Sequence, residues 1–129
     1  LNTTALVHEL YLRVAEREDL VGHLEQIGKR FREGIAAQAV GHGLVVRQSG
    51  PVQLPLILFE SDPYFEHGSL FCAEALARGV YLHPKHNMFL SLAHTEVDID
   101  QALAATDEAF AVVAARHGRD SRYTGSNRR

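Results

Sequence analysis

The chain has 129 residues, which is the size of a single domain and too short for most two-domain enzymes. Hydrophobic residues make up 46% and charged residues 22%, as in ordinary globular proteins, and no run approaches the roughly 20 apolar residues that cross a bilayer. The formal charge of −3 is uneven: four arginines against one aspartate give residues 119–129 a charge of +3, which leaves −6 on residues 1–118. An acidic body argues against a nucleic-acid partner, so the composition predicts a globular domain with neither a membrane nor a nucleic-acid role.

Two single residues bear on the origin of the chain. Cys72 is its one cysteine, which excludes an internal disulfide and predicts a reducing, cytoplasmic compartment. The first residue is Leu1 and the one methionine is Met88, and no signal-peptide pattern opens the chain. We therefore expect this sequence to be part of a longer protein.

The first third of the chain predicts two helices. Leu6, Leu10 and Val14 recur at four-residue spacing, which indicates a short amphipathic helix over residues 5–16. Asp19 can cap a second, longer helix that ends near Gly41 and Gly43. The second helix has an apolar stripe formed by Leu20, Leu24, Ile27, Phe31 and Ile35.

Two β-type runs follow, over residues 44–48 and 54–60, and the turn residues between them are Ser49, Gly50 and Pro51. The second run is nearly all apolar, which is typical of a strand that is buried on both faces. Pro55 cannot donate to a ladder and therefore belongs near the start of this strand.

A helix is expected over residues 64–77, after the break at Ser61, Asp62 and Pro63. Its core-facing residues should be Phe65, Phe71, Ala75 and Leu76. Cys72 lies within this helix, where we expect a core residue rather than a reactive thiol.

Residues 79–100 hold most of the chemical specificity. The β-branched and aromatic residues of 80–82 predict a strand that Pro84 ends, and residues 88–93 predict a second strand. The polar turn between them has His83, Lys85, His86 and Asn87, a concentration of donors and titratable groups that suggests either a binding edge or a solvated turn.

The last helix should begin at Thr95, because Asp98 follows at the spacing of a capping box. Its apolar stripe is Ile99, Leu103, Thr106, Phe110 and Val113. Residues 119–129 are basic and lack apolar periodicity, so we expect a disordered tail after a single domain over residues 1–118. The fold class is α+β: a small, mostly antiparallel sheet of three or four strands with helices packed mainly on one face.

Motifs for catalysis are scarce. His83, His86 and His94 suggest a metal site, but their spacing matches no metal-binding signature, and a His-rich metal-binding domain is the least favoured interpretation. Asp98 and Asp100 resemble a catalytic carboxylate pair, yet in the first turn of a helix their simpler role is capping.

Three segments resemble the C-terminal part of class III, fold-type I pyridoxal-phosphate enzymes, particularly the glutamate-1-semialdehyde aminomutase-like group. Residues 27–35, Ile-Gly-Lys-Arg-Phe-Arg-Glu-Gly-Ile, resemble the helix that follows the large domain of that family. Residues 77–82, Ala-Arg-Gly-Val-Tyr-Leu, and residues 91–100, Ser-Leu-Ala-His-Thr-Glu-Val-Asp-Ile-Asp, resemble its final strand pair and last helix. The resemblance covers residues 5–118.

The resemblance implies the small C-terminal domain of an aminotransferase or aminomutase, which closes one side of the substrate cleft. In the family, pyridoxal phosphate forms a Schiff base with a lysine of the large domain, and neither Lys29 nor Lys85 matches that lysine. It therefore implies a chain that is inactive alone, with no catalytic, cofactor-binding or metal-binding residue of its own. Its partners would be the large cofactor-binding domain and, in the intact protein, a second subunit of a homodimer.

The resemblance makes His83, His86 and Asn87 substrate-cleft candidates, since they would lie nearest the substrate entrance of the intact enzyme. Family members of the aminomutase type have a longer loop with a glutamate here, and many aminotransferases have a carboxylate-binding arginine on the following strand. Residues 88–91 have no arginine, so no amino-acid specificity follows. The alternative is a stand-alone interaction module of the same fold, and an exposed apolar patch on the first helix or the sheet would argue against it.

Overall fold

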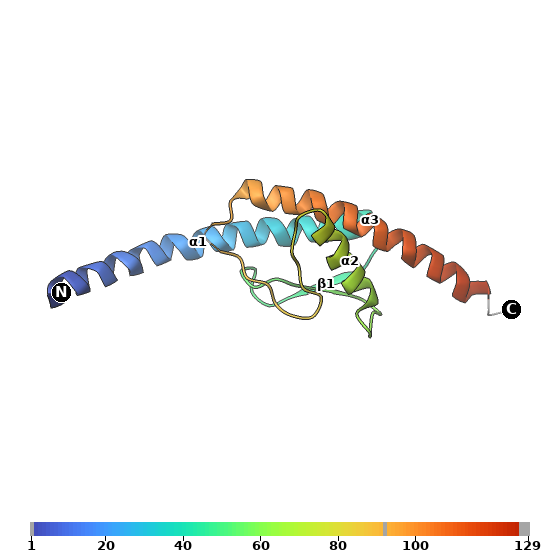
Figure 1. Ribbon diagram of the computed structural model, residues 1–129, viewed down its shortest axis with the longest axis horizontal. Coiled ribbons are helices and arrows are strands. Elements are labelled where there is room, and N and C mark those ends of the chain that lie inside the picture. The colour runs from blue at the N-terminus through green and yellow to red at the C-terminus, as the bar shows by residue number, and fades with distance from the viewer. Residues whose placement is uncertain (1, 92, 127–129) are drawn as a thin grey trace.

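The computed structural model describes residues 2–91 and 93–126, of which residues 11–18 and 119–126 are described by their backbone alone. In chain order its elements are α1 (Thr3–Gly41), β1 (Val46–Ser49), β2 (Leu56–Phe59), α2 (Glu66–Ala77) and α3 (Glu96–Ser126). The helices α1 and α3 run side by side, and the hairpin and α2 pack against this pair (Figure 1). The fold is α+β, as predicted. Within the described residues, none of the helices is both long and apolar enough to cross a bilayer.

A single helix, α1, replaces the two helices predicted for the first third of the chain. Asp19 lies inside α1 and caps nothing, whereas the side chain of Asn2 accepts the backbone N–H of Ala5 at 2.7 Å and is the true N-cap. The prediction was wrong because residues 15–20, Ala-Glu-Arg-Glu-Asp-Leu, contain neither glycine nor proline. Once nucleated, a helix continues through such residues.

The core lies where α1, α2 and α3 meet the hairpin. The predicted stripes are confirmed for their central members: Ile27, Phe31, Ile35, Phe71, Ala75, Ile99, Phe110 and Val113 are all buried. The Phe71 and Phe110 rings are 4.5 Å apart between centroids, and Phe59 of β2 lies 5.5 Å from Phe71. Leu76 was wrongly assigned to this core, because its side chain is 55% exposed.

The two strands form an antiparallel hairpin in which Val46 pairs with Phe59 and Ser49 pairs with Leu56. The predicted runs and their order are confirmed, with Pro55 directly before β2. β2 is not buried on both faces, however: Ile57 is buried against the helices, whereas Leu58 on the opposite face is half-buried. Leu58 pairs with Arg47, so this outer face carries a cation beside an apolar side chain.

The sheet has two strands in the described residues, so the expected third and fourth strands at 80–82 and 88–93 are wrong for the part that is described; residue 92 lies outside it. The N–H of Val80 donates to the carbonyl of Ala75 at the end of α2, so it is not available to a neighbouring strand. The N–H groups of Met88 and Leu90 do donate to the carbonyls of Pro55 and Gln53, at 2.8 and 3.1 Å. Pro55 has no N–H to return, so this pairing cannot become a regular ladder.

The start of α3 is confirmed, and its end is not where we predicted it. The N–H of Thr95 donates to Asp98 Oδ2 at 2.8 Å, and the N–H of Asp98 donates to Thr95 Oγ1 at 3.3 Å, which is a complete capping box. The helix continues to Ser126, past residue 118 where we expected the domain to end, and residues 127–129 lie outside the described residues. The disordered tail over residues 119–129 stays a prediction. No proline follows Pro84 in the sequence, so no residue imposes an earlier end on the helix.

Candidate substrate-cleft loop

The loop of residues 83–87 is held in shape by its own first residue. The Nδ1 atom of His83 accepts the backbone N–H groups of Lys85 at 3.1 Å and His86 at 3.2 Å. Because both partners are donors, this nitrogen carries no proton, and the neutral imidazole has its proton on Nε2. The Nδ1 atom of His83 therefore fixes the shape of the loop, whereas its Nε2 atom has no hydrogen-bond partner among the residues that the structure describes.

The structure brings His83 and His86 together, with their ring centroids 4.7 Å apart. Asn87 has a different position, because its Nδ2 donates to the carbonyl of Leu54 at 2.9 Å and ties the loop to the segment before β2. His83 is half-buried, whereas His86 and Asn87 are exposed. The loop thus presents a pair of imidazoles that can form hydrogen bonds with a ligand.

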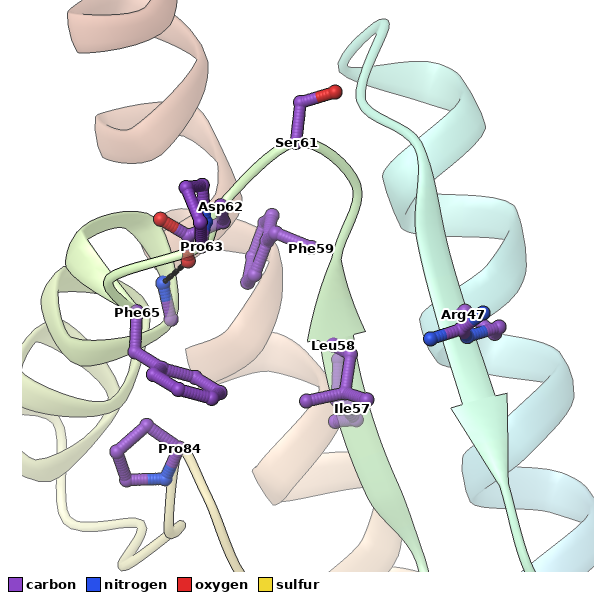
Figure 2. A pocket seen from close by; sticks show the side chains of 10 residues that line it. Arg47, Ile57, Leu58, Phe59, Ser61, Asp62, Pro63, Phe65 and Pro84 are labelled. Atoms are coloured by element: carbon purple, nitrogen blue, oxygen red, sulfur yellow. Dashed lines mark hydrogen bonds between the residues drawn. The ribbon is translucent and has the colours of Figure 1, made fainter.

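A hollow of about 350 Å³ lies beside this loop, and we name it the hairpin cleft. Its main lining residues are Arg47, Leu58, Asp62, Phe65, Gly68 and Pro84. Figure 2 shows Phe65 and Pro84 on one side of β2 and Arg47 on the other side, on β1, with Leu58 between them. Of the loop, Pro84 reaches the cleft, whereas the three predicted contacts do not line it.

The floor of the hairpin cleft is shaped by the turn between β2 and α2. Ser61 and Phe65 both have left-handed backbone conformations, with φ of 58° and 56°. The carboxylate of Asp62 accepts the N–H of His67 at 3.1 Å and the N–H of Gly68 at 2.9 Å, at the N-terminus of α2. Both of its oxygens are therefore occupied within the fold.

One cation, Arg47, lines the cleft, and a second, Lys85, lies next to it without lining it. Lys85 was noticed only as a loop residue, but its Nζ lies 5.3 Å from the centroid of the Phe65 ring, within the range of a cation–π contact. No sequence pattern marks Arg47, because single arginines are common on the exposed faces of strands. Only the pairing of β1 with β2 places it beside Leu58 and the cleft.

A second, larger hollow of about 510 Å³ lies between residues 79–82, residues 88–90 and the start of α3. Its walls are mostly apolar, and two polar side chains at its edge are already engaged. His94 Nδ1 accepts the N–H of Ser91 at 3.0 Å, and Asp98 belongs to the capping box. This hollow therefore has an apolar surface and few free groups for chemistry.

The remaining candidates have structural roles. Burial raises the pKa of the Cys72 thiol to about 11, so this half-buried cysteine is protonated at neutral pH. Asp100 binds Arg30 through two hydrogen bonds of 2.8 and 2.9 Å, and this contact lowers the pKa of Asp100. Among the residues that the structure describes, no group of three or more potential ligands could hold a metal ion, so the metal-binding interpretation has no support there.

The chain's own lysines do not fit pyridoxal phosphate. Lys29 is exposed and pairs with Glu25 at 3.1 Å, four residues earlier on α1. Lys85 is exposed and lies over Phe65. A Schiff-base lysine needs a surrounding site that holds the cofactor, and neither lysine has one.

No family model matches the chain, but individual relatives do. It is 45% identical over 102 residues to the aminopentol aminotransferase of Sphingopyxis macrogoltabida, a match that covers 79% of this chain and 24% of the relative. It is 33% identical over 104 residues to the glutamate-1-semialdehyde 2,1-aminomutase of Sorangium cellulosum (strain So ce56), covering 71% of this chain and 24% of that protein.

Solved structures agree with these relatives. The structure of the internal aldimine form of the FumI protein of Sphingopyxis sp. MTA144, with pyridoxal phosphate, matches with a TM-score of 0.78 at 43% identity. That match covers 83% of this chain and 26% of the other. A transaminase with pyridoxal phosphate bound matches in fold, with a TM-score of 0.66 at 16% identity over 74% of this chain and 24% of the other.

In sequence and fold, the chain thus corresponds to the small C-terminal domain of class III pyridoxal-phosphate-dependent aminotransferases and aminomutases. It spans about a quarter of the length of the relatives that it matches.

Proposed function

We propose that this chain acts as the small domain of a pyridoxal-phosphate-dependent aminotransferase and closes one side of its substrate cleft. The observation that carries the proposal is the 45% identity to an aminopentol aminotransferase, supported by the fold match to the FumI protein. The cofactor and its Schiff-base lysine would belong to a large domain, because Lys29 and Lys85 form no such site. We extend the proposal to a cytoplasmic homodimer for the intact enzyme, on the resemblance and the single cysteine.

Within this enzyme, we assign the loop of residues 83–87 to the substrate entrance. Nδ1 of His83 accepts the loop backbone, and its Nε2 atom, which has no partner among the described residues, would donate to a substrate oxygen. The exposed imidazole of His86 lies beside it. Asn87 positions the loop through its hydrogen bond to Leu54.

Exposed apolar side chains favour this proposal over a stand-alone module. Leu6, Val7 and Leu10 of α1 are 49%, 58% and 51% exposed. This part of α1 projects from the packed body (Figure 1). A large domain that covers this face would bury these side chains, whereas a domain adapted to live alone would gain by replacing them with polar residues.

A chimera tests the proposal directly. The matching quarter of the Sphingopyxis macrogoltabida aminopentol aminotransferase is replaced by this chain, and aminotransfer and cofactor content are measured. We expect a cofactor-loaded, active chimera, because 45% identity to the replaced segment and the fold match to the FumI protein favour the same packing on a large domain. In this chimera, His83→Ala should lower kcat/KM about tenfold or more, as removal of a substrate-binding hydrogen bond does.

The matched control is His117→Ala, which removes an exposed histidine of α3, outside both the loop and the projecting part of α1. A folded chimera without cofactor or activity would contradict the proposal. Pyridoxal phosphate is also added to the 129-residue chain alone, where we expect no stoichiometric Schiff-base absorbance. A specific Schiff base on Lys85 would refute the assignment of the catalytic lysine to a large domain.

A further inference from the structure

The loop of residues 83–87 is attached to one segment of the hairpin, the turn of residues 50–55 between β1 and β2. Asn87 Nδ2 donates to the carbonyl of Leu54, in this turn, at 2.9 Å. Two backbone N–H groups just after the loop donate to further carbonyls of the same turn, at 2.8 and 3.1 Å. Since all three acceptors belong to the turn, its position sets the position of the loop.

Arg32 of α1 holds the other side of this turn. Its Nη2 donates to the carbonyl of Gly50 at 2.6 Å, which is a short, charge-assisted hydrogen bond. Gly50 has a left-handed φ of 80°, and a Cβ added to it would lie 3.3 Å from Nδ2 of Asn87. Gly50 therefore lies between Arg32 and Asn87 and connects α1 to the loop through the backbone of a single residue.

Packing alone does not require an arginine at this position. Arg32 Nε is buried without a hydrogen-bond partner among the residues that the structure describes. The same holds for Oε1 of Gln48, whose Nε2 donates to the Arg32 carbonyl at 2.8 Å. Buried polar atoms of this kind cost stability, whereas a methionine of similar length would fill the space without that cost. What the arginine alone provides is the donor for Gly50.

We propose that Arg32 is a positioning residue for the loop of residues 83–87 and acts on it through Gly50 and Asn87. With the turn fixed, Asn87 holds the loop, and the loop backbone keeps the imidazole of His83 in one orientation. The value of this orientation for substrate binding rests on the proposed aminotransferase function. The effect on the loop depends only on the contacts described above.

Hydrogen exchange of the 129-residue chain, followed by NMR, separates positioning of the loop from general stability. The amides of residues 85, 86, 88 and 90 report on the loop and its attachment, and the amide of the buried Phe110 reports on the core. In Arg32→Met we expect about tenfold faster exchange at the loop amides and less than about a twofold change at Phe110, because the loop opens locally while the core stays packed.

The imidazole of His83 gives a second, spectroscopic readout. At about pH 8, above the ordinary histidine pKa, the ¹⁵N shifts of the wild-type ring should show one tautomer, with the proton on Nε2. In Arg32→Met the shifts should move towards those of an unconstrained imidazole, because the N–H groups of Lys85 and His86 no longer stay at Nδ1. A loss of general stability would not move them in the folded chain.

The matched control is Arg30→Met, which removes a guanidinium two residues earlier on α1. Arg30 binds Asp100 and not the turn, so the exchange of the loop amides should not change. Arg32→Lys keeps a charged donor and should restore part of the protection, and it keeps the proposal testable if Arg32→Met does not fold. Circular dichroism checks the fold of each variant.

Asn87→Ala breaks the other end of the connection at an exposed residue. It should accelerate exchange at the same loop amides. Substitution of Arg32 should then add little further acceleration, because two residues that act through one contact are not additive. Effects of the two substitutions that simply add would contradict action through Asn87.

Unchanged loop amides in Arg32→Met, or an equal change in Arg30→Met, would overturn the proposal. Acceleration at Phe110 as large as at the loop would leave Arg32 a purely structural role and would also overturn it. In the aminotransferase chimera, Arg32→Met should lower kcat/KM by less than His83→Ala does, mainly through KM.

The chimera and the exchange experiment fail separately. An inactive chimera, together with Arg32-dependent protection of the loop, would refute the aminotransferase function and leave the positioning role standing. An active chimera, together with loop amides that do not respond to Arg32→Met, would refute the positioning role alone.

Discussion

At the scale of single residues, Thr95 and Asp98 show how a short motif sets the start of a long helix. Each side chain accepts the backbone N–H of the other, so two donors that α3 leaves free are satisfied. Thr95 Oγ1 also donates to Asp98 Oδ2 at 3.0 Å. These hydrogen bonds lower the pKa of Asp98, because they stabilise its charged form.

Thr95→Ala should destabilise the chain by about 1 kcal/mol, the usual cost of removing an N-cap hydroxyl. Denaturant unfolding monitored by circular dichroism measures the change. Thr95→Ser keeps the hydroxyl and serves as the control, with a much smaller effect. A loss in the serine variant as large as that in the alanine variant would show that the cap is not responsible.

The capping box also predicts a pH dependence. Because the pKa of Asp98 is lower in the folded chain than in the unfolded chain, its stabilisation is present above the ordinary aspartate pKa and is lost as the pH falls through the folded value. The stability difference between the wild-type chain and Asp98→Asn should therefore shrink from neutral pH towards about pH 3. Unfolding free energies measured across this range check the sign, and a difference that grows in acid would contradict it.

Thr106 is a buried polar residue that links α3 to α1. Its Oγ1 donates to Gln38 Oε1 at 2.7 Å, and Gln38 Nε2 donates to the carbonyl of Leu103 at 2.7 Å. Thr106→Val keeps the shape and leaves the Gln38 oxygen without its donor, so we expect a loss of about 1–3 kcal/mol. Thermal and denaturant unfolding measure it. The double variant Thr106→Val with Gln38→Leu should recover part of the loss, because no orphaned acceptor is left.

At the scale of elements, the packing of α1 depends on where its glycines lie. Gly28 is buried and faces the backbone carbonyl of Val52, in the turn between β1 and β2. Gly22 lies on the same helix, exposed, with no atom near the position of an added Cβ. Alanine substitutions at these two positions therefore distinguish the effect of close packing on stability from that of helix propensity.

Gly28→Ala should destabilise the chain by about 1–3 kcal/mol, because the added methyl group collides with backbone that cannot rotate away. Gly22→Ala should stabilise it by about 0.5–1 kcal/mol, because alanine is the better helix former and meets no neighbour. Denaturant unfolding of both variants gives the comparison. Stabilisation of similar size in both would show that the turn at Val52 does not pack on α1 as described.

At the scale of the whole molecule, the ends of α1 and α3 extend from the packed body in opposite directions (Figure 1). The apolar side chains on the projecting part of α1 have no covering element among the described residues. Exposed apolar faces of this kind drive association.

The chain alone should therefore self-associate, and Leu6→Glu with Leu10→Glu should shift it towards the monomer. Analytical ultracentrifugation over a range of concentrations measures the shift. Val40→Glu is the control: Val40 is 78% exposed at the other end of α1, and its replacement should change little. A monodisperse wild-type chain would favour the stand-alone module.

The sequence by itself determined the features that depend on neighbouring residues. The stripe of Ile27, Phe31 and Ile35, the capping box at Thr95 and the order of the two hairpin strands follow from local periodicity and turn chemistry, and the structure confirms them. The motifs of residues 77–82 and 91–100 also indicated the family correctly, because they are contiguous in the chain.

The tertiary structure decided what depends on residues far apart. Residues 80–82 and 88–91 have strand-like composition, but neither forms a strand. The N–H of Val80 donates to the carbonyl of Ala75 at the end of α2, and the segment paired with residues 88–90 contains Pro55, which has no N–H to donate. Arg47 became part of a cleft only through its pairing with Leu58. Hydrogen-bond partners and cleft walls depend on which chain segments lie next to each other in space. Local sequence patterns carry no information about which segments these will be.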